Sequence, residues 1–284
     1  MAKGSGVDRT ENARKMLEEA VEKFSQTENW QQFLKGMRSF HKYSLNNQWL
    51  IAVQREDTHW VKGYRAWQDL GRQVVKGSEA IWILAPRPYT KEREDGTEEK
   101  KIAFRAIPVF AYEDTEPIEG FENPWEPPVR QPVTGDPEAA QRLLDSLFAY
   151  TAAQGIPVVI EAKKTSAGGS YTPADNSIWL QPYDPVEQAR VLVHELGHAA
   201  TYKTLTEGGK PYDYSFGEAV AESIAYVVCG EFGIDTTLAS VQYIAVWDAD
   251  RLRETASIVK DACSALFDWL DRELGEEARE DVAA

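Results

Sequence analysis

The sequence predicts an α+β protein, with a small α+β N-terminal domain followed by a mainly helical domain that carries a short sheet. Helical and strand-like patterns alternate in the first half, whereas long helical patterns dominate the second. Charge divides the chain in the same way. Residues 1–110 hold 19 Lys and Arg against 15 Asp and Glu (net +4), and the remainder holds 12 against 31 (net -19). With 284 residues, 43% of them hydrophobic, the chain is long enough to form two domains, each with a hydrophobic core of its own.

A proline-rich acidic segment separates the two halves. Residues 113–137 contain six of the 14 prolines and few regularly spaced apolar residues, which is typical of a stiff connector. We therefore predict a first domain over 8–112, a linker over 113–136 and a second domain over 137–275.

The first domain opens with helical patterns. Residues 8–24 have amphipathic spacing, and Thr27 and Ser44 are each suited to cap a further helix. A short helix is expected near residues 64–70, where Gly71 would end it.

A hairpin is predicted after these helices. Strand-like runs occupy residues 80–86 and 102–112, and they flank a charged loop, KEREDGTEEK. The Asp95-Gly96 pair inside that loop suits a tight turn.

The second domain begins with a helix whose leucines share one face and which ends near Gly155. Strands are predicted at 158–162 and 177–180, on either side of a loop rich in Gly and Ser. The next helix has a clear start, because Asp184 can be its N-cap and Glu187 the reciprocal member of a capping box.

The stretch VLVHELGHAA lies inside that helix and places two of the four histidines four residues apart. Residues at this spacing share a helix face, so His194 and His198 can both reach one metal ion. Glu195 lies beside them, where it can act as a general base on a metal-activated water. Gly197 leaves room for another segment to approach closely. The alternative is a chance match in which both histidines are core residues.

The following helix carries two carboxylates among apolar residues. Glu218 and Glu222 are four apart and share a face, and each needs a partner if it is buried. Packed against the first helix, Glu218 would be the third ligand of one zinc ion, and Glu222 would hydrogen-bond the far nitrogen of a ligating histidine. Alternatively, Ser215 and Glu218 form a capping box, which leaves Glu222 without a partner.

Basic and aromatic residues alternate in the first half. Five of the nine tryptophans fall between residues 30 and 82, and residues 30–87 hold nine Lys and Arg against four Asp and Glu. Single-stranded nucleic acid is bound by this combination, because bases stack on aromatic rings while cations neutralise phosphates. The alternative is that the tryptophans form a core and the cations are solvated.

Composition also bears on the cellular location. No window approaches the roughly 18 consecutive apolar residues that a membrane span needs, and the first residues are polar and charged. Cys229 and Cys263 lie in helical patterns, so a disulfide framework is not expected and both are interpreted as small buried residues. We expect a cytoplasmic protein without a membrane partner.

Two groups of motifs resemble the ArdC-type antirestriction proteins. HELGH, EAVAESIAYVVCGEFGIDT and SVQYIAVWDAD resemble the zincin-like metallopeptidase domain of that family, which is related to the ImmA/IrrE peptidases. RSFHKYSLNNQWLIAVQ and VKGYRAWQDLGRQVVKGSEAIWILAP resemble its N-terminal domain, which binds single-stranded DNA in the family.

The resemblance implies His194, His198 and Glu218 as zinc ligands, Glu195 as the catalytic base of peptide hydrolysis and Glu222 as the supporting carboxylate. It also implies a protein of a mobile element that protects incoming DNA from restriction. A host protein would be the peptidase substrate.

The resemblance does not identify the DNA contacts, so these are chosen from the basic and aromatic residues of the first half. The candidates are Lys42, Trp49, Lys62, Tyr64, Arg65, Trp67 and Lys76. Tyr243 has two interpretations, an oxyanion-stabilising group near the zinc or a packing residue.

Three classes of function remain open from the sequence. The first is a DNA-binding peptidase, and the second is a protein that shields single-stranded DNA and whose zinc site is structural. The third is an acidic decoy of a DNA-binding enzyme, suggested by the charge of the second half. Glu195 favours the first class over the second, because a structural site needs no base.

Overall fold

The computed structural model describes residues 6–24, 27–56, 58–93, 97–127, 132–236 and 249–274, and it has the predicted α+β class. The chain forms two compact units that are not contiguous in sequence. The first unit contains residues up to Lys23 together with Tyr43–Pro127. The second contains Phe24–Lys42 and the described residues within 132–274. No helix among the described residues is long and apolar enough to cross a membrane.

The helices of the first unit lie where the sequence predicts them. Ser44 caps one of them by accepting a hydrogen bond from the Asn47 amide, and Gly71, with φ of 73°, follows the last. They are α1 (Gly6–Phe24), α3 (Leu45–Gln54) and α4 (Tyr64–Asp69).

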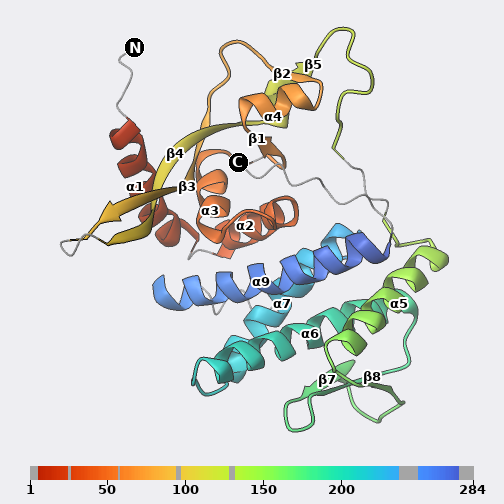
Figure 1. The fold of residues 1–284 in the computed structure, drawn as a ribbon. Coiled ribbons are helices and arrows are strands. Elements are labelled where there is room, and N and C mark those ends of the chain that lie inside the picture. The colour runs from red at the N-terminus through yellow and green to blue at the C-terminus, as the bar shows by residue number, and fades with distance from the viewer. Residues whose placement is uncertain are drawn as a thin grey trace. The chain divides into compact units, whose positions relative to one another are not determined.

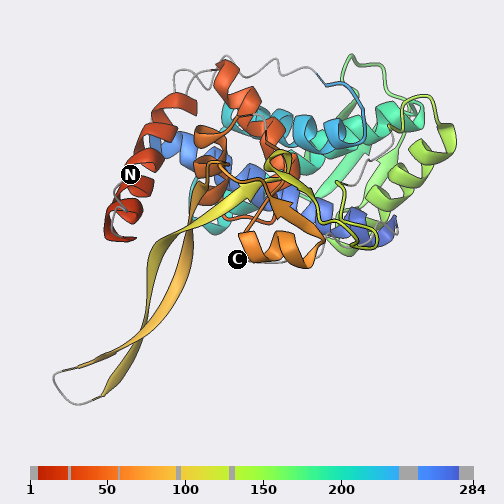
Figure 2. The same ribbon diagram turned by 90° about the horizontal axis from the view of Figure 1, so that it is seen from above.

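A long antiparallel ribbon dominates the sheet of this unit. Strand β3 (Ile81–Glu92) pairs along its whole length with β4 (Glu98–Ala111), and β1 (Val61–Lys62) extends the sheet on the far side of β4. Figure 2 shows the ribbon as an extended hairpin. The predicted hairpin is therefore present, but its strands are longer than expected. Half of the predicted charged loop belongs to the strands, and the Asp95-Gly96 turn lies outside the described residues.

Side chains cap both edges of the ribbon at its base. On the β3 edge, the Asn47 amide donates to the Leu84 carbonyl at 3.0 Å and accepts from the Leu84 amide at 2.9 Å. Gln54 bonds Trp82 in the same two ways. On the β4 edge, Thr10 accepts from the Ala106 amide at 3.0 Å. These bonds satisfy strand groups that have no neighbouring strand.

The first part of the predicted linker is folded into this unit. A 3-10 turn, η1 (Tyr112–Asp114), leads into β5 (Thr115–Pro117), which pairs antiparallel with β2 (Arg72–Val74). Further along, Trp125 packs at ring-centroid distances of 5.3 Å from Trp60 and 5.7 Å from Trp67. The prolines and acidic residues of 113–127 therefore surround a small aromatic cluster.

The second unit is mainly helical, with a short sheet, as predicted. In Figure 1 α6 lies between α7 and the strands of the small sheet. Cys229 and Cys263 are buried and free. The helices are α2 (Thr27–Phe40), α5 (Pro137–Ala153), α6 (Pro185–Glu207), α7 (Tyr214–Glu231) and α9 (Ala249–Glu273).

The sheet has the order β6-β8-β7 and mixed directions. Strand β6 (Val158–Ile160) is parallel to β8 (Ser177–Leu180), and β7 (Gly169–Thr172) is antiparallel to β8. The two predicted strands are β6 and β8. Strand β7 lies within the predicted Gly/Ser loop, which therefore carries an edge strand next to α6.

Helices α6 and α7 approach each other closely at Gly197. A Cβ atom on Gly197 would lie 2.6 Å from the Ala221 Cα atom, which is closer than real Cβ contacts. The predicted close approach is confirmed, and its partner is the helix that carries Glu218.

Candidate metal centre

Helix α6 presents the residues of the HELGH motif to one side. Asp184 is its N-cap, as predicted, and accepts hydrogen bonds from the Val186 and Glu187 amides. Glu187 does not fold back in a capping box. Its carboxylate instead forms a two-point ion pair with Arg190, one turn further along.

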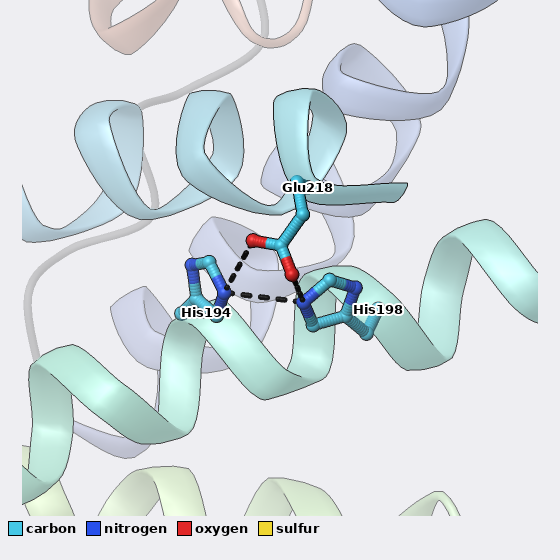
Figure 3. A group of neighbouring side chains, drawn as sticks. All are labelled: His194, His198 and Glu218. Atoms are coloured by element: carbon cyan, nitrogen blue, oxygen red, sulfur yellow. Dashed lines mark hydrogen bonds and ion pairs between the residues drawn. The ribbon is translucent and has the colours of Figure 1, made fainter. Parts of the chain in front are cut away.

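Helix α7 brings Glu218 to the same place. Its N-cap is Asp213, which accepts from the Phe216 amide at 3.3 Å, so Ser215 is not the capping residue. The alternative capping role of Glu218 is therefore absent. Figure 3 shows the Glu218 carboxylate reaching from α7 toward the two imidazoles of α6.

The three side chains converge. The Nε2 atoms of His194 and His198 are 3.1 Å apart. The Glu218 carboxylate oxygens lie 3.5 Å from the first nitrogen and 3.4 Å from the second. Among the described residues they form the group suited to a metal ion, each offering one ligand atom within 4.8 Å of the others.

These separations fit a divalent ion. Metal–ligand distances of about 2.0 to 2.1 Å in tetrahedral geometry place neighbouring ligand atoms about 3.3 Å apart. The observed 3.1 to 3.5 Å match that spacing, so the side chains need little movement to coordinate one. Two imidazoles and one carboxylate also leave a fourth position open, as in zinc sites that react with substrates.

Charge within the cluster favours this arrangement. Hydrogen bonds from His194 and His198 hold the pKa of the Glu218 carboxyl well below its ordinary value. Burial lowers the pKa of His194, but its bond to Glu218 and the charges of Glu195, Glu218 and Glu222 outweigh burial and raise it. The carboxylate is thus ionised and attracts a positive charge at this point.

Glu195 is buried beside the cluster, with 6% of its surface exposed. Its Oε2 atom accepts a hydrogen bond of 2.8 Å from the backbone amide of Tyr171, in the edge strand β7. Burial raises the pKa of this carboxyl, and the neighbouring histidines and the Tyr171 amide only partly oppose the shift. A raised pKa suits a group that must both accept and return a proton.

Two tyrosines that the sequence analysis did not identify complete the surroundings. The Tyr212 hydroxyl lies 2.9 Å from Nδ1 of His198. Burial raises the pKa of this tyrosine. A hydrogen bond to Glu218 raises the pKa of Tyr214 to about 12, and its ring stacks near His198 with an interplanar angle of 15°. Tyr212 lies just before α7 and Tyr214 is its first residue, and only their nearness to EAVAES in sequence could have indicated them.

The supporting role of Glu222 stays a prediction. The far nitrogen of His198 faces Tyr212, and the charge of Glu222 acts on His194, the other histidine of the cluster. Tyr243 lies outside the described residues.

The cluster opens into a cavity of about 480 Å³. Its walls include the β7 segment on one side and both tyrosines on the other. The cavity borders all three converging side chains and Glu195, and its volume would hold a short stretch of polypeptide.

The predicted DNA contacts separate into different environments. Trp49 and Trp67 are fully buried, and each therefore packs in the core and offers no ring face to a base. This is a correction to their candidate role, and it favours the core alternative. Lys42 belongs to the second unit, where its ammonium lies 3.8 Å from Asp268.

The remaining candidates lie at the surface of the first unit or near it. Tyr64 is 48% exposed, Arg65 and Lys76 are exposed, and Lys62 lies 6.0 Å from the ring centroid of Trp125. These four can reach a ligand from solvent.

Comparison with known proteins gives matches in both sequence and fold. Residues 10–114 match the family described as the N-terminal domain of anti-restriction factor ArdC. An uncharacterized protein of Bacillus anthracis is 24% identical, over 94% of this chain and 52% of the relative. The chain thus spans about half the length of that curated relative.

Solved structures of the antirestriction ArdC protein from the R388 plasmid also match. The metal-free crystal structure has a TM-score of 0.54 and 20% identity, covering 82% of this chain and 85% of that chain. The Mn(II)-bound structure has a TM-score of 0.49 and 21% identity, covering 82% and 84%. Residues 10–114 therefore match the ArdC N-terminal domain family, and the α+β fold of the chain is similar to that of ArdC.

Proposed function

We propose that this protein is an antirestriction factor that binds single-stranded DNA and carries a zinc-dependent peptidase site. The convergence of His194, His198 and Glu218 beside the buried Glu195 is the observation that carries the peptidase assignment. A cavity at this point gives a substrate access to all four residues.

The residues of the site have different roles in the proposed peptide hydrolysis. A zinc ion held by the three ligands would polarise the scissile carbonyl and lower the pKa of a water toward 7. Glu195 Oε1 takes a proton from the attacking water and delivers it to the leaving amine nitrogen. The Tyr171 amide holds the other oxygen, Oε2, and so fixes the direction in which the carboxylate points.

The DNA-binding assignment is supported by the family of residues 10–114 and by the exposed cations and tyrosine of the first unit. Cations neutralise phosphates, and exposed aromatic rings stack on bases. In this proposal the protein protects DNA of a mobile element as that DNA enters a cell.

Metal analysis tests the site directly. Purified wild-type protein should contain one equivalent of zinc, and His194→Ala should lose it. Glu195→Gln should keep the zinc, because Glu195 is not a ligand, yet abolish proteolysis and any antirestriction activity that depends on it. Metal content equal in wild type and His194→Ala would reject the site.

The alternative function is the shielding of single-stranded DNA around a structural zinc, in which Glu195 would only pack against β7 and accept the hydrogen bond from Tyr171. It predicts that Glu195→Gln keeps full protection of DNA. The same variant therefore separates the two functions, because only the peptidase needs the proton transfer.

A further inference from the structure

The outer part of the β3–β4 ribbon has two chemically different faces. Directly paired residues of antiparallel strands share a face, and successive pairs alternate between faces. One face carries the pairs Pro86↔Phe104, Pro88↔Ile102 and Thr90↔Lys100. The other carries Ala85↔Arg105, Arg87↔Ala103, Tyr89↔Lys101 and Lys91↔Glu99.

The second of these, hereafter the cationic face, bears four cations, one tyrosine and one carboxylate. The cations Arg87, Lys91, Lys101 and Arg105 follow the ribbon through successive pairs, over about 20 Å at the usual strand rise. Tyr89 lies among them and is 45% exposed.

Ion pairing leaves most of this positive charge available. Glu99 is engaged by Lys101 at 3.3 Å and by Arg93 at 3.2 Å. Among the described residues, no ion pair is recorded for Arg87, Lys91 or Arg105, and all three are exposed. The face therefore presents a one-sided row of solvated cations around an accessible aromatic ring.

We propose that this cationic face is the surface that binds the single-stranded nucleic acid, with phosphates against the cations and a base stacked on Tyr89. The inference rests on the proposed function, which supplies the ligand class but no contact surface. A row of phosphates complements the row of cations, and the ring accepts any base because every base has a π face.

The chemistry of Tyr89 favours a single strand over a duplex. The bases of a duplex are already stacked on one another, so the ring would gain a partner only by disrupting that stack. Trp49 and Trp67 are buried, whereas Tyr64, Phe104 and Phe121 are exposed, as Tyr89 is. Of these exposed rings, Tyr89 is the one that lies on the cationic face, among its four cations.

The test measures binding of the full-length protein to a fluorescent oligonucleotide as a function of salt. The double variant Arg87→Thr/Arg105→Thr should bind more weakly and should flatten the slope of log affinity against log salt by about 1.4, since each lost phosphate contact contributes about 0.7. Tyr89→Leu should weaken binding about 5- to 150-fold at an unchanged slope, the loss of one stacked base. Lys100→Thr is the matched control, because it removes an exposed cation from the opposite face of the same ribbon.

The outcomes separate this inference from the proposed function. Wild-type protein that binds no single strand would overturn both. Wild-type binding with unchanged affinity and slope in the double variant would overturn the ribbon assignment alone, as would an equal loss in Lys100→Thr. Tighter binding of a duplex through the same face, insensitive to Tyr89→Leu, would overturn the single-strand assignment. Circular dichroism of each variant checks that the ribbon remains folded.

Discussion

At the scale of single residues, the candidate site depends on the hydrogen-bond partner of the His198 ring nitrogen that faces away from the cluster. Nε2 of His198 points into the cluster, and its Nδ1 lies 2.9 Å from the Tyr212 hydroxyl. A metal bound at Nε2 requires the neutral imidazole with its proton on Nδ1, which then donates to the tyrosine oxygen. The lack of a side chain on Gly217 leaves room for the Tyr212 hydroxyl, because a Cβ atom on residue 217 would lie 2.1 Å from that oxygen.

Tyr212→Phe should therefore weaken zinc binding without unfolding the protein. The loss of a partner behind a metal ligand typically costs about 10- to 100-fold in affinity. Competition with a chromophoric chelator measures the change. Tyr202→Phe is the control, because that ring packs 5.8 Å from Tyr212 and the variant removes the same atom. Equal affinities in wild type and Tyr212→Phe would show that the hydroxyl does not orient His198.

At the scale of elements, the site depends on the distance between α6 and α7. The helices meet at Gly197 and Ala221, which lie next to His198 and one turn beyond Glu218. The ligand from α7 reaches the ligands of α6 because the two backbones are so close at this point. A wider separation would carry the Glu218 carboxylate away from both imidazoles.

Gly197→Ala should therefore separate the helices and reduce both stability and zinc affinity. The added methyl group would overlap the Ala221 backbone, and overpacking of this kind costs about 1 to 3 kcal/mol of unfolding free energy. Gly36→Ala in α2 is the matched control. Its Cβ atom would meet only the Phe40 ring at 3.7 Å, so higher helix propensity should stabilise the protein by about 0.5 to 1 kcal/mol. Urea unfolding compares the two, and changes of the same sign would contradict this explanation.

The elements also show which features could be predicted from sequence. Signals that act within a few residues were confirmed, including the N-caps Ser44 and Asp184. The convergence of the HELGH histidines with Glu218 followed from two local motifs and the packing of the helices that carry them. Features that depend on distant pairing were missed. Strand β7 has no alternating apolar pattern and exists because β8 pairs with it. Tyr212 reaches His198 only because the loop before α7 folds back.

Which aromatic side chains are buried also depends on the tertiary fold more than on the composition of the segment. The same interleaved pattern that indicated DNA contacts contains tryptophans that are wholly buried and a tyrosine that is not. Of the four cations on the ribbon, only Lys91 lay in the predicted loop, and Arg105 lay in a predicted strand. The face that they share exists only in the register of β3 against β4. A single sequence can indicate the turn of a hairpin, but it does not give the register in which the two strands pair.

At the scale of the whole molecule, the chain enters the second unit early and then returns to the first. Residues Phe24–Lys42, which include α2, belong to the same unit as α6 and α7 although they precede most of the first unit. Trp30 of α2 is fully buried, and its indole donates to the Ser223 hydroxyl of α7 at 3.2 Å. Arg38 donates to the Tyr226 carbonyl at 3.1 Å. The segment that matches the ArdC N-terminal domain therefore also supplies part of the core beneath the candidate metal site.

Trp30→Ala should consequently impair the zinc site more than a comparable change in the first unit. Truncation of a buried tryptophan costs about 3 to 5 kcal/mol, and here the loss falls on the unit that holds α6 and α7. Trp67→Ala removes a side chain of the same size and burial, whose indole donates to the Phe110 carbonyl within the first unit. Zinc stabilises whatever unit binds it, so it should raise the melting temperature of that unit's transition. We expect Trp30→Ala to lower the melting temperature of the transition that zinc shifts. Trp67→Ala should leave the effect of zinc on that melting temperature unchanged. The reverse pattern in calorimetric scans would show that α2 stabilises the first unit instead, and the discontinuous division of the chain would then be rejected.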